Sequence, residues 1–149
     1  MNALLRPVCA SAILWAGLAP AWAQQPAATA PDIDPNTLAN AGLRVVQLID
    51  AGRAGEVWDG ASTVAKRSVD RAKFTETIES RRKPLGPAAS RRWTSVSRHS
   101  TPGSGLLPAG TYANVAFESR FAGGGSGDEL VSFRQDEDGT WRLSGYVLK

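Results

Sequence analysis

This chain contains almost no cysteine or histidine. Its 149 residues include one cysteine, Cys9, and one histidine, His99. An internal disulfide needs two thiols, and a zinc site needs several Cys or His ligands, so neither is expected. His99 lies between Arg98 and Ser100 in a polar stretch, where imidazole chemistry would lack partners. The sequence therefore predicts no metal site and no cofactor, with His99 at the surface.

Long apolar runs are also missing, apart from one stretch near the start. There, Arg6 precedes the apolar run Val8 to Ala19, and Ala21-Trp22-Ala23 has the small-x-small cleavage pattern. These features are typical of a secretory signal peptide, and the run is short for a membrane span. An uncleaved anchor is the alternative. We expect residues 1–23 to be a cleaved signal peptide, with export to the periplasm, or alternatively to the extracellular medium.

Cleavage would change the composition of what remains. Cys9 would leave with the signal, so the mature chain would have no thiol and would depend on packing for its stability. Loss of Arg6 lowers the formal net charge from +3 to +2, which is too small for many phosphate contacts and argues against nucleic-acid binding. Residues 24–34 are rich in Ala, Pro and Gln, which predicts a disordered leader. No later run is long enough to span a membrane.

The next part of the chain has helical periodicity. Asp34 can cap a helix that has Pro35 at its first position, and glycines end that helix within residues 50–55. A second helical pattern runs from Val57 to Val69, and a third covers residues 70–82 before the prolines and glycine of KPLGP.

After Gly86 the period changes to two, which is typical of strands. Strands are expected at residues 90–100, 111–121, 129–135 and 139–149, with turns between them. Helices followed by antiparallel strands indicate an α+β fold, in which N-terminal helices pack on a curved antiparallel sheet of about four strands. We expect one such domain over residues 35–149.

The last strand presents apolar residues on both faces. Regular alternation puts Trp141, Leu143, Gly145 and Val147 on one face and Tyr146 and Leu148 on the other. Gly145 would leave a gap where the sheet can curve or a helix can approach. Apolar residues on both faces are unusual for a monomer, so a homodimer is one hypothesis.

Several short motifs occur in the order seen in a family of secreted bacterial proteins. They are VWDGAS, RRKPLG, LPAGTYANVAF, DEL and DEDGTWRLSGYVL, within Leu43 to Leu148. The most specific is G-x-W-R-x-x-G-Y, here Gly139, Trp141, Arg142, Gly145 and Tyr146. The chain resembles the domain of unknown function 4019 family. The resemblance implies a cystatin-like or nuclear-transport-factor-2-like cone, with helices in the concave side of the sheet, and it implies no activity.

Asp59 is the one catalytic candidate, beside the aromatic Trp58. A carboxylate at the mouth of a cavity can act as a general base if burial raises its pKa, and Glu118 could face the same cavity and pair with Asp59. The alternative is that Asp59 caps a helix, as Asp more commonly does. Glu118 alternatively pairs with an arginine on the solvated face. Trp58, Tyr112 and Tyr146 are the aromatic candidates for contacting a ligand.

A span without acids suggests a basic surface. Between Glu79 and Glu118 no acidic residue occurs, while six basic residues do: Arg81, Arg82, Lys83, Arg91, Arg92 and Arg98. One interpretation is a basic patch that meets an anionic envelope partner; the other is a set of solvated positions compensated in the fold.

The function that the sequence favours is a non-catalytic binding or accessory module of the cell envelope, with an unknown protein or small-molecule partner. A small lyase, isomerase or hydrolase using Asp59 and a structural homodimer are the alternatives.

Overall fold

The computed structural model describes residues 33–105 and 107–149. The helices are α1 (Pro35–Asp50), α2 (Ala54–Asp59), α3 (Thr63–Ser68), α4 (Arg71–Arg82) and a 3-10 turn, η1 (Lys83–Leu85). The strands are β1 (Ala88–Thr101), β2 (Gly110–Phe121), β3 (Ser126–Gln135) and β4 (Trp141–Leu148). The expected signal peptide and the expected leader up to residue 32 lie outside the described residues. Ile33 packs against the core and Asp34 caps α1.

Three of the helices, α1, α3 and α4, begin at capping side chains. The Asp34 carboxylate accepts a hydrogen bond from the backbone N–H of Asn36 at 3.1 Å, with Pro35 at the first position, as predicted. Ser62 and Asp70 cap α3 and α4 in the same way. The single helix expected over Val57 to Val69 is wrong: α2 ends before Ser62, whose backbone N–H donates to the carbonyl of Leu143 on β4 at 2.8 Å. That contact interrupts the helix and divides it into α2 and α3.

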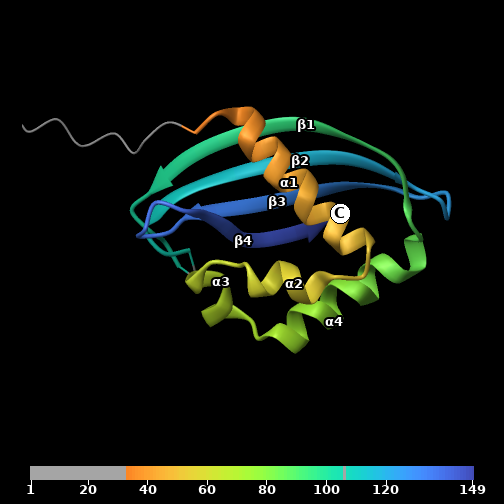
Figure 1. The fold of residues 1–149 in the computed structure, drawn as a ribbon, viewed down its shortest axis with the longest axis horizontal. Coiled ribbons are helices and arrows are strands. Elements are labelled where there is room, and N and C mark those ends of the chain that lie inside the picture. The colour runs from red at the N-terminus through yellow and green to blue at the C-terminus, as the bar shows by residue number, and fades with distance from the viewer. Residues whose placement is uncertain (1–32, 106) are drawn as a thin grey trace, which may run out of the picture. The chain divides into compact units, whose positions relative to one another are not determined.

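The four strands form one antiparallel sheet in the order β1-β2-β3-β4. As Figure 1 shows, α1 runs across the sheet, while α2, α3 and α4 lie together beside β4. Contacts agree with this view, because α1 touches β1, β2 and β3, whereas α3 touches β4 and α2 packs on α4. The predicted α+β fold, with helices packed on a curved antiparallel sheet, is therefore confirmed.

The hydrophobic core lies between the sheet and the helices. Alternate residues of β2 and β3 face it, as the period of two predicts. They include Ala113, Val115, Phe117, Phe121, Val131 and Phe133, all buried. Val46 and Ile49 of α1 and Ile78 of α4 close the core from the helical side.

The predicted faces of β4 are wrong beyond Leu143. Leu143 pairs with Phe133 and Gly145 pairs with Ser132, so Ser144 has no partner on β3 and forms a β-bulge. One extra residue reverses the alternation, and Tyr146 pairs with Val131 on the helical face. Leu148 likewise pairs with the buried Glu129. Tyr146 and Leu148 therefore belong to the helical face, whereas Val147 pairs with Leu130 on the other face and is 41% exposed.

Within the described part of the chain, no helix combines the length and apolar character that a membrane span requires.

Candidate functional site

A buried carboxylate occupies the centre of the helical face of the sheet. The side chain of Glu129 on β3 is 0% exposed. Its Oε1 accepts hydrogen bonds from Arg82 Nη1 at 3.2 Å and from the Tyr146 hydroxyl at 2.6 Å. Its Oε2 accepts from Arg91 Nε at 2.7 Å and from the hydroxyl of Ser119. Four donors from α4 and three strands therefore converge on one carboxylate.

Asp50 at the end of α1 closes these contacts into a ring. Arg82 Nη2 donates to Asp50 Oδ1, and Arg91 Nη1 donates to Asp50 Oδ2 at 2.8 Å. Two arginines are thus each shared between the same two carboxylates, and the formal charges cancel. A buried charge is costly unless it is paired and hydrogen-bonded, and here every carboxylate meets both conditions. We call Asp50, Arg82, Arg91 and Glu129 the ionic ring.

The ring also controls the protonation of Tyr146. Burial, together with the hydrogen bond to the Glu129 carboxylate, raises the pKa of Tyr146 far above its usual range. The phenol therefore stays protonated and remains a donor at physiological pH. Because the Glu129 oxygens are already taken by four donors, Glu129 and Tyr146 are suited to holding the fold together and poorly suited to moving a proton.

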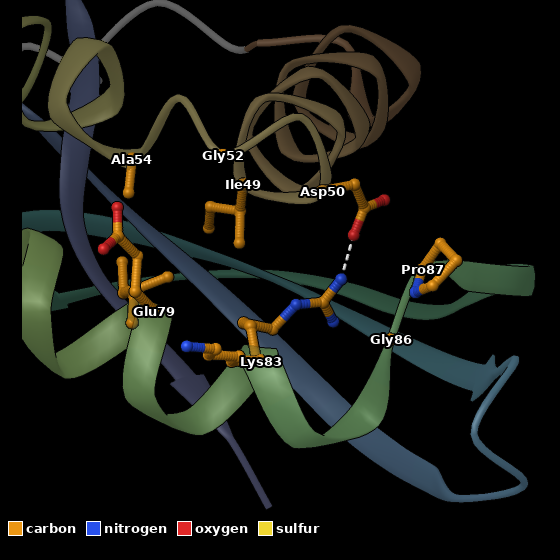
Figure 2. A pocket seen from close by; sticks show the side chains of 10 residues that line it. Ile49, Asp50, Gly52, Ala54, Glu79, Lys83, Gly86 and Pro87 are labelled. Atoms are coloured by element: carbon orange, nitrogen blue, oxygen red, sulfur yellow. Dashed lines mark hydrogen bonds and ion pairs between the residues drawn. The ribbon is translucent and has the colours of Figure 1, made fainter.

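A pocket of about 380 Å³ opens above the ionic ring, between the ends of α1 and α4. Its floor is apolar, formed by Ile49, Ala54 and Ile78, and Asp50 and Arg82 form a charged wall. Figure 2 shows Asp50 joined to the guanidinium of Arg82, with Ala54 and Glu79 pointing toward one another across the pocket.

Glu79 and Lys83 stand on α4 and η1 at the rim of this pocket. Within the part of the chain that the structure describes, neither side chain makes a hydrogen bond or an ion pair. Their backbones are fixed by the helix, but their charged groups are available to a ligand. The rim thus offers one anion and one cation over an apolar floor.

A second hollow lies on the other side of Ile78. It has a volume of about 260 Å³ between α2, α3, α4 and the bulge of β4. Trp58, Phe74 and Tyr146 line it, and the indole N–H of Trp58 is already bonded to the carbonyl of Val69 at 3.0 Å. This hollow is mostly apolar and offers little polar anchorage.

Asp59 does not lie in either pocket. Its side chain is 52% exposed and forms two hydrogen bonds with Arg71, at 2.9 and 3.0 Å. The Arg71 guanidinium holds the pKa of Asp59 below its usual range, which is the opposite of what a general base needs. Asp59 also ends α2 and does not cap a helix.

The suggested pair of Asp59 with Glu118 is wrong. Glu118 lies on the sheet face away from the helices and bonds to Arg92 across the strands. This is the alternative that the sequence left open, a carboxylate paired with an arginine on the solvated face.

The three aromatic candidates do not form one site. Trp58 and Tyr146 line the same hollow, whereas Tyr112 faces away from the helices. The Tyr112 hydroxyl donates to the carbonyl of Pro108 at 2.9 Å, and its ring stacks on His99 with centroids 5.9 Å apart. Tyr112 therefore fastens the loop between β1 and β2.

The six residues of the expected basic patch are dispersed. Arg82 and Arg91 turn inward to the ionic ring, and Lys83 stands at the pocket rim. The others are spread over α4 and β1: Arg81 donates to the carbonyl of Leu148 at 3.4 Å, Arg92 bonds Glu118, and Arg98 is exposed. Acidic side chains within the fold therefore neutralise at least three of these six basic residues, namely Arg82, Arg91 and Arg92.

Sequence reasoning overlooked Asp50 and Glu129. A usable indication existed for Glu129, because it alternates in step with Val131 and Phe133 and so had to face the core. Asp50 carried no such indication, since it stood at a helix end among turn residues.

Among the described residues, no group of three or more His, Cys, Asp or Glu side chains is placed to hold a metal ion.

Comparison with known proteins agrees with the resemblance seen in the motifs. No curated protein matches the chain. The model of one family, described as protein of unknown function (DUF4019), matches residues 41–146, which include all four residues of the ionic ring. The chain belongs to this family.

Proposed function

We propose that this domain is a non-catalytic binding module that takes a small molecule into the pocket between α1 and α4. One observation carries the proposal. The pocket has an apolar floor and an unpaired Glu79 and Lys83 at its rim, over an ionic ring in which all charges are already paired.

The arrangement favours binding over catalysis. A catalytic carboxylate needs access to substrate and a pKa near the working pH. Glu129 is enclosed by donors, Asp50 is held by two arginines, and Asp59 is paired at the surface. The enzyme alternative based on Asp59 gains no support from this geometry.

The pocket's chemistry defines the class of ligand. Its volume of about 380 Å³ lies in the range of small-molecule sites. Ile49, Ala54 and Ile78 would bury an apolar body, while Lys83 would meet a carboxylate and Glu79 an ammonium group. A zwitterion with an apolar side chain, such as an amino acid or a dipeptide, fits this combination.

The N-terminal sequence supports a role in the cell envelope. Residues 1–23 have the pattern of a cleaved secretory signal, and we propose export to the periplasm on that basis. A cone-like fold of the cystatin or nuclear-transport-factor-2 type, with helices in the concave side of a curved sheet, would suit such a module.

A thermal-shift screen tests the proposal on the mature chain. The probes are the twenty common L-amino acids and dipeptides of Leu, Val and Phe at millimolar concentration. A ligand present at about a hundred times its Kd stabilises the fold by about 2.7 kcal/mol, which raises Tm by roughly 10 °C. No shift with any probe would overturn the proposed ligand class.

Matched variants assign a positive result to this pocket. Lys83→Met and Glu79→Gln should each weaken binding about tenfold or more, because each removes one charge from the rim. The controls are Lys73→Met and Glu76→Gln, which make the same changes on α4 at an exposed pair bonded at 3.1 Å. Equal losses of affinity in the rim variants and in the control variants would mean that the ligand binds elsewhere.

A further inference from the structure

The two edges of the sheet differ. At the β4 edge, the backbone N–H of Ser62 donates to the carbonyl of Leu143 at 2.8 Å, and Arg81 donates to the carbonyl of Leu148. At the β1 edge, no backbone hydrogen bond from another element of the described chain reaches the strand. Alternate N–H and C=O groups along the 14 residues of β1 therefore point away from β2 with no strand to meet them.

An apolar hollow accompanies this open edge. Trp93 on β1 is 58% exposed, and Leu43 on α1 is 37% exposed. Both line a hollow of about 150 Å³ between α1 and β1, whose floor is the buried Phe117. Trp93 pairs with Phe117 in the sheet and so lies on the helical side of the edge. A strand added to β1 would have space for one apolar side chain between Trp93 and Leu43.

A second copy of the chain would suit this edge less well than an acidic strand, because β1 would bring three arginines and no acidic residue to a pair with itself. In an antiparallel self-pair centred on Ser95, Arg92 of one copy would lie opposite Arg98 of the other. Like charges directly opposite one another are destabilising. The strand contains no acidic residue, so an acidic strand would meet no like charge from β1.

We propose that the β1 edge binds an extended, acidic segment of a partner protein by strand addition. The backbone groups of β1 would supply the main-chain hydrogen bonds. The hollow beside Trp93 would take an apolar side chain. Arg92, which is 73% exposed where it bonds Glu118, would share its guanidinium with a carboxylate of the segment. This surface is separate from the α1–α4 pocket, so either proposal can fail without the other.

The first test uses two synthetic peptides and the ¹⁵N-labelled mature chain. One is a blocked decapeptide of alternating Val and Glu, and the other alternates Val and Lys. We expect the acidic peptide to shift the amide resonances of β1 and slow their hydrogen exchange, with an affinity that falls as salt is added. The basic peptide should bind at least about tenfold more weakly.

Variants then locate the contacts. Trp93→Ala should weaken the acidic peptide about tenfold or more, as expected for an aromatic anchor. Arg92→Glu should weaken the acidic peptide and strengthen the basic one, a reversal that a merely damaged fold would not produce. Lys73→Glu, the same charge reversal on α4, should change neither affinity.

Three results would overturn the proposal. The first is equal binding of the two peptides, or none. The second is protection of amides away from β1. The third is protection of β1 amides in the peptide-free protein that increases with protein concentration, which would make a second copy the occupant.

Discussion

The hydroxyl of Tyr146 on β4 donates a hydrogen bond of 2.6 Å to Oε1 of Glu129 on β3. Regular alternation from Trp141 would have turned this hydroxyl to the opposite face of the sheet. The bulge at Ser144 brings it to the helical side, where it satisfies the buried carboxylate. A local irregularity in one strand thus completes the hydrogen bonding of a charge in the next.

Loss of the Glu129 charge should be strongly destabilising. Glu129→Gln leaves Arg82 and Arg91 sharing Asp50 alone, and it turns amide hydrogens toward donors. Breaking a buried ion pair by removing one partner costs about 3–5 kcal/mol in the free energy of unfolding. Urea denaturation followed by circular dichroism measures this cost.

Glu118→Gln is the matched control for that experiment. Glu118 bonds Arg92 on the opposite face, and both side chains are partly exposed. Its replacement should change the free energy of unfolding by at most about 1 kcal/mol. Equal effects of the two substitutions would mean that the ionic ring contributes no more than a surface pair.

Tyr146 should make the fold sensitive to alkali. Its folded-state pKa is raised by burial and by the Glu129 carboxylate, so its contribution is complete below the unfolded pKa, near 10. As the pH rises above about 10, the unfolded chain loses the proton first, and stability falls by up to about 1.4 kcal/mol per pH unit.

The tyrosinate absorbance near 295 nm follows this group directly. The chain has two tyrosines, so a Tyr112→Phe background isolates Tyr146. We expect ionisation only together with unfolding, and Tyr146→Phe should flatten the decline above pH 10. Reversible ionisation of Tyr146 in the folded protein near pH 10 would contradict the buried hydrogen bond.

Much of the fold follows from local patterns in the sequence. The Asp34-Pro35 pair predicts the start of α1, and the alternation around Val115 and Val131 predicts which faces of β2 and β3 are buried. These predictions succeed because each depends on residues that are neighbours in sequence.

The ionic ring illustrates what such patterns leave undetermined. Alternation places Glu129 on the buried face, but the partners of Glu129 come from residues 82 and 91, on two other elements. Only the packing of α4 and β1 brings them together. The bulge at Ser144 was equally inaccessible, since Gly145 is compatible with a bulge, a bend or a close helix contact.

Replacing Gly42 with a larger residue should destabilise the fold. It is buried in α1 where the helix crosses the sheet, and a Cβ there would lie 3.1 Å from Val115 Cβ and 3.2 Å from the Phe117 ring. Gly42→Val should therefore lower the free energy of unfolding by about 1–3 kcal/mol through overpacking. Gly60→Ala is the control, because its Cβ would meet nothing closer than 3.7 Å.

A pair of single-residue changes tests the role of the bulge itself. Deletion of Ser144 removes the unpaired residue but keeps Leu143 opposite Phe133 and Tyr146 opposite Val131. The strand becomes regular and the Tyr146 hydroxyl still reaches Glu129. We expect this variant to fold, with a free energy of unfolding lowered by less than about 2 kcal/mol, as for a modest packing change.

Insertion of one alanine between Gly145 and Tyr146 should behave differently. A slip of one residue turns Tyr146 and Leu148 to the solvated face, and the Glu129 carboxylate loses a donor. The insertion should lower the free energy of unfolding by nearly as much as Glu129→Gln does. Adding Tyr146→Phe to the insertion should lower it little further, because the hydrogen bond is already lost. If deletion proves as damaging as insertion, the bulge is needed for its own shape, as a wall of the hollow beside Trp58, and the direction of Tyr146 is secondary.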